Sequence, residues 1–234
     1  MREAALSGQT PQTGMGDVAV ARARQSEDVL AGGEIVRHRL SSRVIHWTVA
    51  VFFFLALLTG LPIWTPIFGW MASLFGGLSV CRWLHPWTGV VFAAASLVMF
   101  VHWFSEMHLT GKDREFLTPS GMIRYFRYQG EDSEVGKYNG GQKLYFWAVS
   151  LGAVGLLLSG LLMWFPRAFP RIVLEFAFLI HDITFILFVV SLVFHIYLGT
   201  AAEPGTFRSM TRGTVSRPWA RLHHPGWLKD IDHE

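Results

Sequence analysis

The sequence contains a single cysteine, Cys81, in 234 residues. One cysteine excludes an intrachain disulfide, and it excludes a cysteine-based zinc site or an iron–sulfur cluster held by this chain alone. Charged residues are also scarce: they make up 16% of the chain, against about 25% in a typical soluble domain. This shortage of charge indicates an integral membrane protein.

Long apolar runs take the place of charge. Hydrophobic residues make up 51% of the chain, and the mean hydropathy is +0.34. A helix that crosses a bilayer needs about 20 mostly apolar residues, and four runs meet this condition. They lie at about residues 44–64, 83–104, 144–165 and 175–200. The sequence therefore predicts an all-α integral membrane protein, a four-transmembrane-helix bundle over residues 37–200.

The segments outside the spans are more polar. Residues 1–36 lack the continuous apolar stretch of a signal peptide, so we expect a flexible N-terminal extension. Residues 201–234 are expected to form a C-terminal tail. Residues 65–81 are expected to form a loop, followed by a second span with Pro86 in its first turn. Residues 118–128 predict a short helix on the membrane surface.

Lysine and arginine are distributed unevenly along the chain. The five segments outside the spans hold, in chain order, 6, 1, 6, 2 and 5 of them. Because basic residues concentrate in cytoplasmic loops, this pattern predicts that both termini lie in the cytoplasm. The net charge of +3 does not indicate nucleic-acid binding, because membrane topology explains basic residues beside apolar runs.

The fourth span carries two histidines, His181 and His195, fourteen residues apart. On a helix this spacing is about 21 Å and about 40° short of four full turns, so both imidazoles leave on nearly the same side. His46 lies near the start of the first span and His85 near the start of the second, which gives two pairs by depth: His46 with His195, and His85 with His181. Imidazole is a good axial ligand for haem iron, so each pair is predicted to bind one haem b. Without a CxxCH motif, covalent attachment is not indicated.

Other residues remain open alternatives. A histidine in a span can be an ordinary hydrogen-bonded packing residue. His102 is a further ligand candidate, although its spacing turns it about 100° off the face of His85. Asp182 is a candidate for function because a carboxylate inside a membrane is costly, yet it points about 100° away from His181. The remaining histidines are expected to be solvated: His38, His108, His223, His224 and His233.

Several motifs together identify a family resemblance. They are HWTVAVFFFLALLTG at 46–60, LHPWTGV at 84–90, VGKYNGGQK at 135–143, LIH at 179–181, HIY at 195–197 and VSRPWARLHHPGW at 215–227. With these motifs the chain resembles the cytochrome b (gamma) subunit of membrane-bound respiratory formate dehydrogenase, over about residues 37–230. The KYNxGQK turn and the last motif are the specific parts, since they are unlike generic cytochromes b.

The resemblance implies cofactors, partners and a location. Such a subunit sits in the bacterial inner membrane among lipid and anchors an iron–sulfur (beta) and a molybdopterin catalytic (alpha) subunit on the outer face. Electrons then pass through an outer and an inner haem b to a quinone, menaquinone or ubiquinone, near the cytoplasmic surface. On this sequence the outer haem falls to His85 and His181, and the inner haem to His46 and His195. The chain itself would perform no formate chemistry, because nothing in it binds molybdopterin.

The resemblance also implies a quinone pocket in the turn before the third span. It points to Asn139, Gly141 and Gln142, with His195 adjoining. The amides of Asn and Gln can donate hydrogen bonds to the carbonyl oxygens of a quinone. A turn of this composition can equally be an ordinary helix entry.

Three other functions compete with this reading. The nearest is the cytochrome b subunit of a membrane-bound hydrogenase or a related reductase, which shares the haem arrangement. A haem-free membrane anchor is the second. A small transporter is the third, but the sequence has neither an internal repeat nor interrupted helices with polar groups. Departures from the family pattern are the long N-terminal extension, Asp182 and His102.

Overall fold

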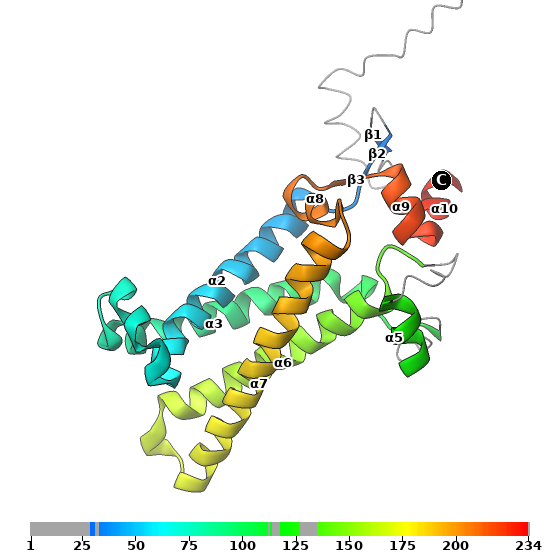
Figure 1. Cartoon of the computed structure of the whole chain (residues 1–234). Helices are drawn as coiled ribbons and strands as arrows, with labels where there is room; N and C mark the ends of the chain where they lie inside the picture. The colour runs from blue at the N-terminus through cyan, green and yellow to red at the C-terminus, as the bar shows by residue number, and fades with distance from the viewer. Residues whose placement is uncertain (1–28, 31–32, 112, 114–117, 127–134, 234) are drawn as a thin grey trace, which may run out of the picture.

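Four long helices form the body of the protein. The computed structural model describes residues 29–30, 33–111, 113, 118–126 and 135–233 (Figure 1). Each of the four helices is long and apolar enough to cross a membrane, which agrees with the predicted number of spans. In chain order they are α2 (Leu40–Trp64), α3 (Leu78–Trp103), α6 (Gly140–Trp164) and α7 (Arg171–Tyr197).

Shorter elements connect and follow the four helices. The helical ones are η1 (Pro66–Phe75), η2 (Phe104–Glu106), α5 (Pro119–Phe126), η3 (Pro166–Ala168), η4 (Leu198–Ala202), α8 (Thr206–Thr211), α9 (Arg217–His223) and α10 (Pro225–His233). The strands are β1 (Val29–Leu30), β2 (Glu34–Val36) and β3 (Thr214–Ser216), which form one antiparallel sheet in the order β1–β2–β3. The described residues are therefore mostly helical rather than all-α as predicted.

Two glycines, and not the proline, set the start of α3. Gly76 and Gly77 have φ angles of 90° and 113°, which residues with a side chain rarely adopt. The chain turns there, so α3 begins at Leu78 and not at residue 83. Pro86 consequently lies in the third turn of α3 instead of the first. The expected loop before it is largely the 3₁₀ helix η1.

A buried aromatic cluster joins the membrane helices. α2 packs against α3, α3 against α6, and α6 against α7. Phe188 of α7 lies 5.5 Å from Phe53 of α2 and 6.0 Å from Phe92 of α3, measured between ring centroids. All three rings are buried. On α6 the ring of Phe188 meets bare backbone, because a Cβ atom at Gly152 would lie 2.2 Å from its Cε2 atom.

The segment after α7 folds onto the segment before α2. Ile35 of β2 pairs with Val215 of β3, and both are almost fully buried. They share a small apolar core with four residues of α9 and α10: Trp219, Ala220, Trp227 and Leu228. We call β2, β3, α9 and α10 together the sheet unit. It takes in residues predicted to be an N-terminal extension and a tail, while residues 1–28 lie outside the described part of the chain.

Three histidines that we expected to be solvated are buried. His38, His223 and His224 expose 4%, 8% and 1% of their surface, so the expectation is wrong for them. They lie in the sheet unit or beside it, and its core joins residues about 180 positions apart, which a local hydrophobic pattern does not reveal. The expectation is confirmed for His108 and His233, which are exposed.

The sheet places both flanks of the membrane region at one end of the bundle. β2 precedes α2 and β3 follows α7, and their pairing agrees with an even number of spans. Figure 1 shows the sheet together with α8, α9 and α10 at this end. We call it the sheet end, and the opposite one the far end. His46 and His195 lie toward the sheet end, His85 and His181 toward the far end.

We expect Gly152→Ala to destabilise the fold by about 1–3 kcal/mol, because the added methyl group would push the enclosed ring of Phe188 out of place. Gly155→Ala is the matched control on the same helix. A Cβ atom there would lie 3.6 Å from the hydroxyl oxygen of Thr184, an ordinary contact. Thermal unfolding in detergent measures the difference, and equal melting temperatures for the two variants would contradict the tight fit at Gly152.

We also expect the sheet unit to loosen in acid. Burial, and then the charge of Arg37, lower the pKa of His224 to about 2, whereas an unfolded histidine titrates near 6.5. Between these values only the unfolded state binds the proton, so stability falls as the pH drops below about 6.5. Amide hydrogen exchange of residues 214–228, corrected for its intrinsic pH dependence, should speed up between about pH 7.5 and 5.5.

The control for the acid prediction is His224→Gln, which keeps a side-chain amide and does not titrate. Its exchange should depend less on pH. Some dependence should remain, because burial and the charge of Arg37 also lower the pKa of His38. Exchange in the wild type that did not change with pH would show that no histidine here is held neutral.

Candidate functional site

The four predicted ligands meet as two facing pairs of imidazole rings. The ring centroids of His46 and His195 lie 6.1 Å apart, and those of His85 and His181 lie 6.2 Å apart. A metal ion binds an imidazole nitrogen at about 2 Å, and that nitrogen lies about 1 Å from the ring centre. Two imidazoles on opposite sides of one iron atom therefore have centroids about 6 Å apart. Both pairs have the separation that axial ligation of one haem iron requires.

The angles between the rings are compatible with ligation as well. The ring planes of the sheet-end pair meet at 41° and those of the far-end pair at 75°. Each ring can rotate about its own bond to the iron, so ligation does not fix this angle. Among the described residues no group of three or more His, Cys, Asp or Glu side chains could hold a metal ion by itself. The pairs thus suit an iron whose other ligands come from a porphyrin.

In the far-end pair, hydrogen bonds settle which nitrogen of each ring carries the proton. Nδ1 of His85 lies 3.0 Å from the carbonyl oxygen of Ala56 and must donate to it. Nδ1 of His181 lies 2.9 Å from the hydroxyl oxygen of Ser159. That hydroxyl donates its proton to the carbonyl of Gly155 at 2.6 Å, so it accepts from His181. Both rings therefore keep the Nε2 lone pair for a metal, the arrangement expected when second-shell groups orient a ligand.

Two glycines make room for the same pair. A Cβ atom at Gly60 of α2 would lie 2.8 Å from Cε1 of His85. A Cβ atom at Gly160 of α6 would lie 3.5 Å from Cε1 of His181. Neither role was predicted from the sequence, although Gly60 follows His46 and Phe53 at intervals of seven residues, which places all three on one face of α2.

The sheet-end pair is supported by packing. Tyr145 of α6 stacks on His195 with ring centroids 4.6 Å apart and planes only 6° from parallel. Trp47 meets His46 edge to face at 5.3 Å. Nδ1 of His46 is buried and has no hydrogen-bond partner among the described residues. Burying a polar nitrogen without a hydrogen bond destabilises the fold, which favours a bound group that interacts with the imidazole of His46.

His102 is engaged away from both pairs. Its Nε2 atom lies 2.8 Å from the hydroxyl oxygen of Ser42, and its ring meets that of Trp103 at 4.8 Å. This contact links α3 to α2 near the sheet end. Asp182 is partly buried beside His181 on α7.

The predicted quinone residues lie in the first turn of α6, at the sheet end. Asn139 caps the helix: its Oδ1 atom accepts from the Gln142 backbone nitrogen at 2.9 Å, and Oε1 of Gln142 accepts from the Asn139 backbone nitrogen at 3.1 Å. Gly141 lies between them and is partly buried. This capping box is the ordinary explanation for the two amides. The turn is nevertheless close to the sheet-end pair, because Tyr145, one helical turn beyond Gln142, stacks on His195.

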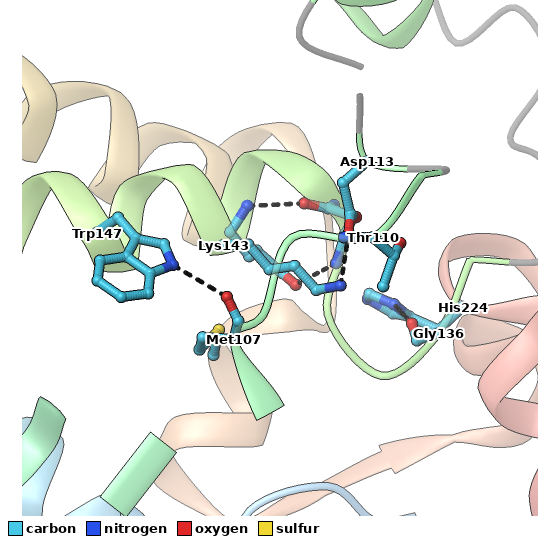
Figure 2. Close-up of polar contacts among 9 residues, drawn as sticks. Met107, Thr110, Asp113, Gly136, Lys143, Trp147 and His224 are labelled. Carbon is cyan, nitrogen blue, oxygen red and sulfur yellow. Dashed lines mark hydrogen bonds and ion pairs between the residues drawn. The ribbon is translucent and has the colours of Figure 1, made fainter. Parts of the chain in front are cut away.

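A buried ion pair fastens the neighbouring loop to α6 (Figure 2). Nζ of Lys143 lies 2.7 Å from Oδ2 of Asp113, and Thr110 donates to the same oxygen through its backbone nitrogen and its hydroxyl. Burial raises the pKa of Asp113, but the hydrogen bonds from Lys143 and Thr110 outweigh it and hold that pKa below its usual range. Farther along α6, Trp147 donates to the carbonyl of Met107 at 3.0 Å.

An open groove of about 410 Å³ lies elsewhere, between α2 and α8. Its lining is mostly apolar and comprises Leu40, Arg43, Val44, Trp47, Thr48, Val51, Phe52, Met210 and Thr211. It includes none of the predicted quinone residues.

The histidine geometry agrees with what the chain is similar to. The chain matches the family described as prokaryotic cytochrome b561 over residues 37–213. The protein therefore belongs to the prokaryotic cytochrome b561 family, and this membership implies haem b.

Within that class, the similar proteins are subunits of formate dehydrogenases. The chain is 34% identical over 200 residues to the formate dehydrogenase cytochrome b556(fdo) subunit of Escherichia coli K12, a match that covers 84% of this chain and 93% of the relative. It is 33% identical over 202 residues to the nitrate-inducible cytochrome b556(Fdn) subunit of the same strain, covering 85% and 92%. It is 32% identical over 203 residues to the formate dehydrogenase cytochrome b556 subunit of Haemophilus influenzae, covering 84% and 83%. These matches confirm the resemblance and support a membrane cytochrome b that transfers electrons.

We expect Gly60→Ala to lower the haem b content, because the new methyl group would displace the ring of His85. Gly69→Ala, in η1 and away from the histidine-bearing helices, is the control, since a Cβ atom there would meet nothing within 4 Å. The pyridine haemochrome assay on both purified variants gives the content directly. If Gly60→Ala kept the wild-type haem content and the wild-type spectrum of the reduced haems, the position of His85 would not depend on the space beside Gly60.

Proposed function

We propose that this chain is the membrane electron-transfer subunit of a formate dehydrogenase complex, with two haems b and a site that reduces a quinone. The observation that carries the proposal is the pair of histidine pairs: each has a separation of about 6 Å between ring centres, and α7 contributes one ring to each. His46 and His195 hold one haem and His85 and His181 the other. A haem b with two histidine ligands supplies one-electron transfer.

The two sites lie on one electron route through the bundle. His181 and His195 stand about 21 Å apart along α7, which covers most of the apolar thickness of a bilayer. Phe188 lies seven residues from each, so the buried cluster of Phe53, Phe92 and Phe188 lies between the two pairs. Dense apolar packing there excludes water from the middle of the route.

Quinone reduction belongs at the sheet end. One quinone takes up two electrons and two protons to give one quinol, so its site needs an electron donor, polar groups for the carbonyl oxygens and access to protons. The turn with Asn139, Gly141 and Gln142 offers amide groups, and through Tyr145 it adjoins His195. The sheet end also lies beyond the apolar part of the helices, where water can supply protons.

The orientation completes the proposal. The lysine and arginine pattern favours the cytoplasmic side of a bacterial inner membrane for both termini and for the sheet end. The far end then faces the iron–sulfur subunit, and a molybdopterin subunit oxidises formate beyond it. The relatives named as formate dehydrogenase subunits favour this donor over a hydrogenase.

The test is the haem content of the chain purified with its partner subunits. We expect two haems b in the wild type and the loss of one in each of His181→Ala and His195→Ala. His108→Ala is the control, because this exposed histidine should leave both haems in place. Reduction by formate, followed by reoxidation on adding a quinone, then tests the donor and the acceptor. A wild-type complex without haem, made with adequate haem supply, would leave only a membrane anchor.

A further inference from the structure

Arg37 is a buried cation packed against the sheet unit. It follows β2 directly, and only 4% of its surface is exposed. Its guanidinium carbon lies 4.6 Å from the ring of Trp219, 5.8 Å from Trp227 and 6.0 Å from Tyr138. Loss of solvation lowers its pKa to about 10, so it remains charged at neutral pH. Aromatic faces stabilise such a desolvated cation, and this offsets part of the free energy lost when the charge is buried.

The fixed cation reaches the turn before α6. Nη2 of Arg37 donates to the carbonyl oxygen of Lys137 at 2.9 Å and to Oε1 of Gln142 at 3.4 Å. Oε1 of Gln142 also accepts from the backbone nitrogen of Asn139 at 3.1 Å. With both donors on Oε1, the amide of Gln142 has one orientation, and its NH₂ group is left on the other side as a donor.

The sheet unit itself holds the same turn from a second side. Nδ1 of His224 lies 2.7 Å from the carbonyl oxygen of Gly136, as Figure 2 shows. The backbone nitrogens of Gly226 and Trp227 both donate to the carbonyl oxygen of Val135, at 2.9 and 3.2 Å. Residues 135–142 are therefore fastened between Arg37 and the start of α10, and their shape depends on the sheet unit being folded.

We propose that Arg37 is a positioning residue for quinone reduction: it fixes the amide of Gln142 so that its NH₂ group donates to a carbonyl oxygen of the quinone. The inference rests on the proposed function, since it requires the quinone to bind at this turn. Arg37 acts through Gln142 and does not touch the quinone. The sheet unit serves as the frame that holds this donor in place.

The test compares quinone kinetics in the assembled complex for Arg37→Gln, Gln142→Ala and the double variant. Removal of one oriented hydrogen bond is worth about 1.4 kcal/mol, so each single variant should raise the KM for a short-chain quinone about tenfold. Because both changes remove the same contact, the double variant should be no worse than Gln142→Ala alone. Reduction of the haems by formate in the absence of quinone should proceed at the wild-type rate in all three.

Two further variants separate positioning from folding. Arg37→Lys keeps the charge near the aromatic rings, but its flexible ammonium group lacks the rigid planar guanidinium that aims Nη2 at both acceptors, so it should also raise the KM. Arg221→Gln changes an exposed arginine of α9 and is the matched control with wild-type kinetics. Melting temperatures show whether Arg37→Gln is folded. If it is not, the KM of Arg37→Lys is the test of the positioning role.

The outcomes are distinct. A raised KM in Arg37→Lys and Gln142→Ala, without additivity in the double variant, supports the proposal. Additive effects, or a wild-type KM in both Arg37 variants while Gln142→Ala is impaired, overturn it and leave the quinone site intact. A wild-type KM in Gln142→Ala overturns the inference together with the quinone site at this turn, even if the complex still reduces quinone elsewhere.

Discussion

The distance between two imidazole rings across the bundle is the constraint on which the membrane region depends. Both pairs include a ring from α7, so α7 must stand at one fixed distance from α2 and from α3 while it packs against α6. The residues around the rings serve this distance. Gly60 and Gly160 admit the far-end rings, Ser159 orients His181, and Tyr145 backs His195. Midway along α7, the ring of Phe188 fills the space that this distance leaves between the helices. The bare backbone at Gly152 makes room for that ring.

At the sheet end, a different kind of interaction takes over. There, backbone hydrogen bonds, a small apolar core and one enclosed cation fasten the turn before α6 to the two flanks of the membrane region. A second fastening comes from the other direction, through the buried pair of Lys143 and Asp113. The first turn of α6 is thus held by polar contacts on both sides, while apolar packing predominates along the rest of that helix. This division suits a helix whose first turn meets polar ligands and whose remainder meets lipid.

The four long helices could be predicted from the length of the apolar runs, and the facing of the histidine pairs from their depth in the spans and from helical periodicity. Fourteen residues on one helix have a known rotation, so the spacing alone places His181 and His195 on one face. The start of α3 was predicted wrongly because Pro86 is tolerated inside a helix that a pair of glycines begins. The sheet unit was missed for another reason: its strands are three residues long, and the core joins Ile35 to Val215 across the whole membrane region. The roles of Gly60 and Ser159 depend on how helices are rotated against each other, which no single helix specifies.

The pairing of β2 with β3 has a consequence for the order in which the protein is completed. The ribosome makes β2 and α2 first, and the turn before α6 follows, but β3, α9 and α10 emerge only after α7 has been made. Throughout the synthesis of the four long helices, Arg37 therefore lacks the rings of Trp219 and Trp227 that enclose it. The turn next to His195 gains this support only after α7 has been made, when residues 214–233 fold against it. Synthesis of the four long helices and the final folding of the turn before α6 are therefore separate steps.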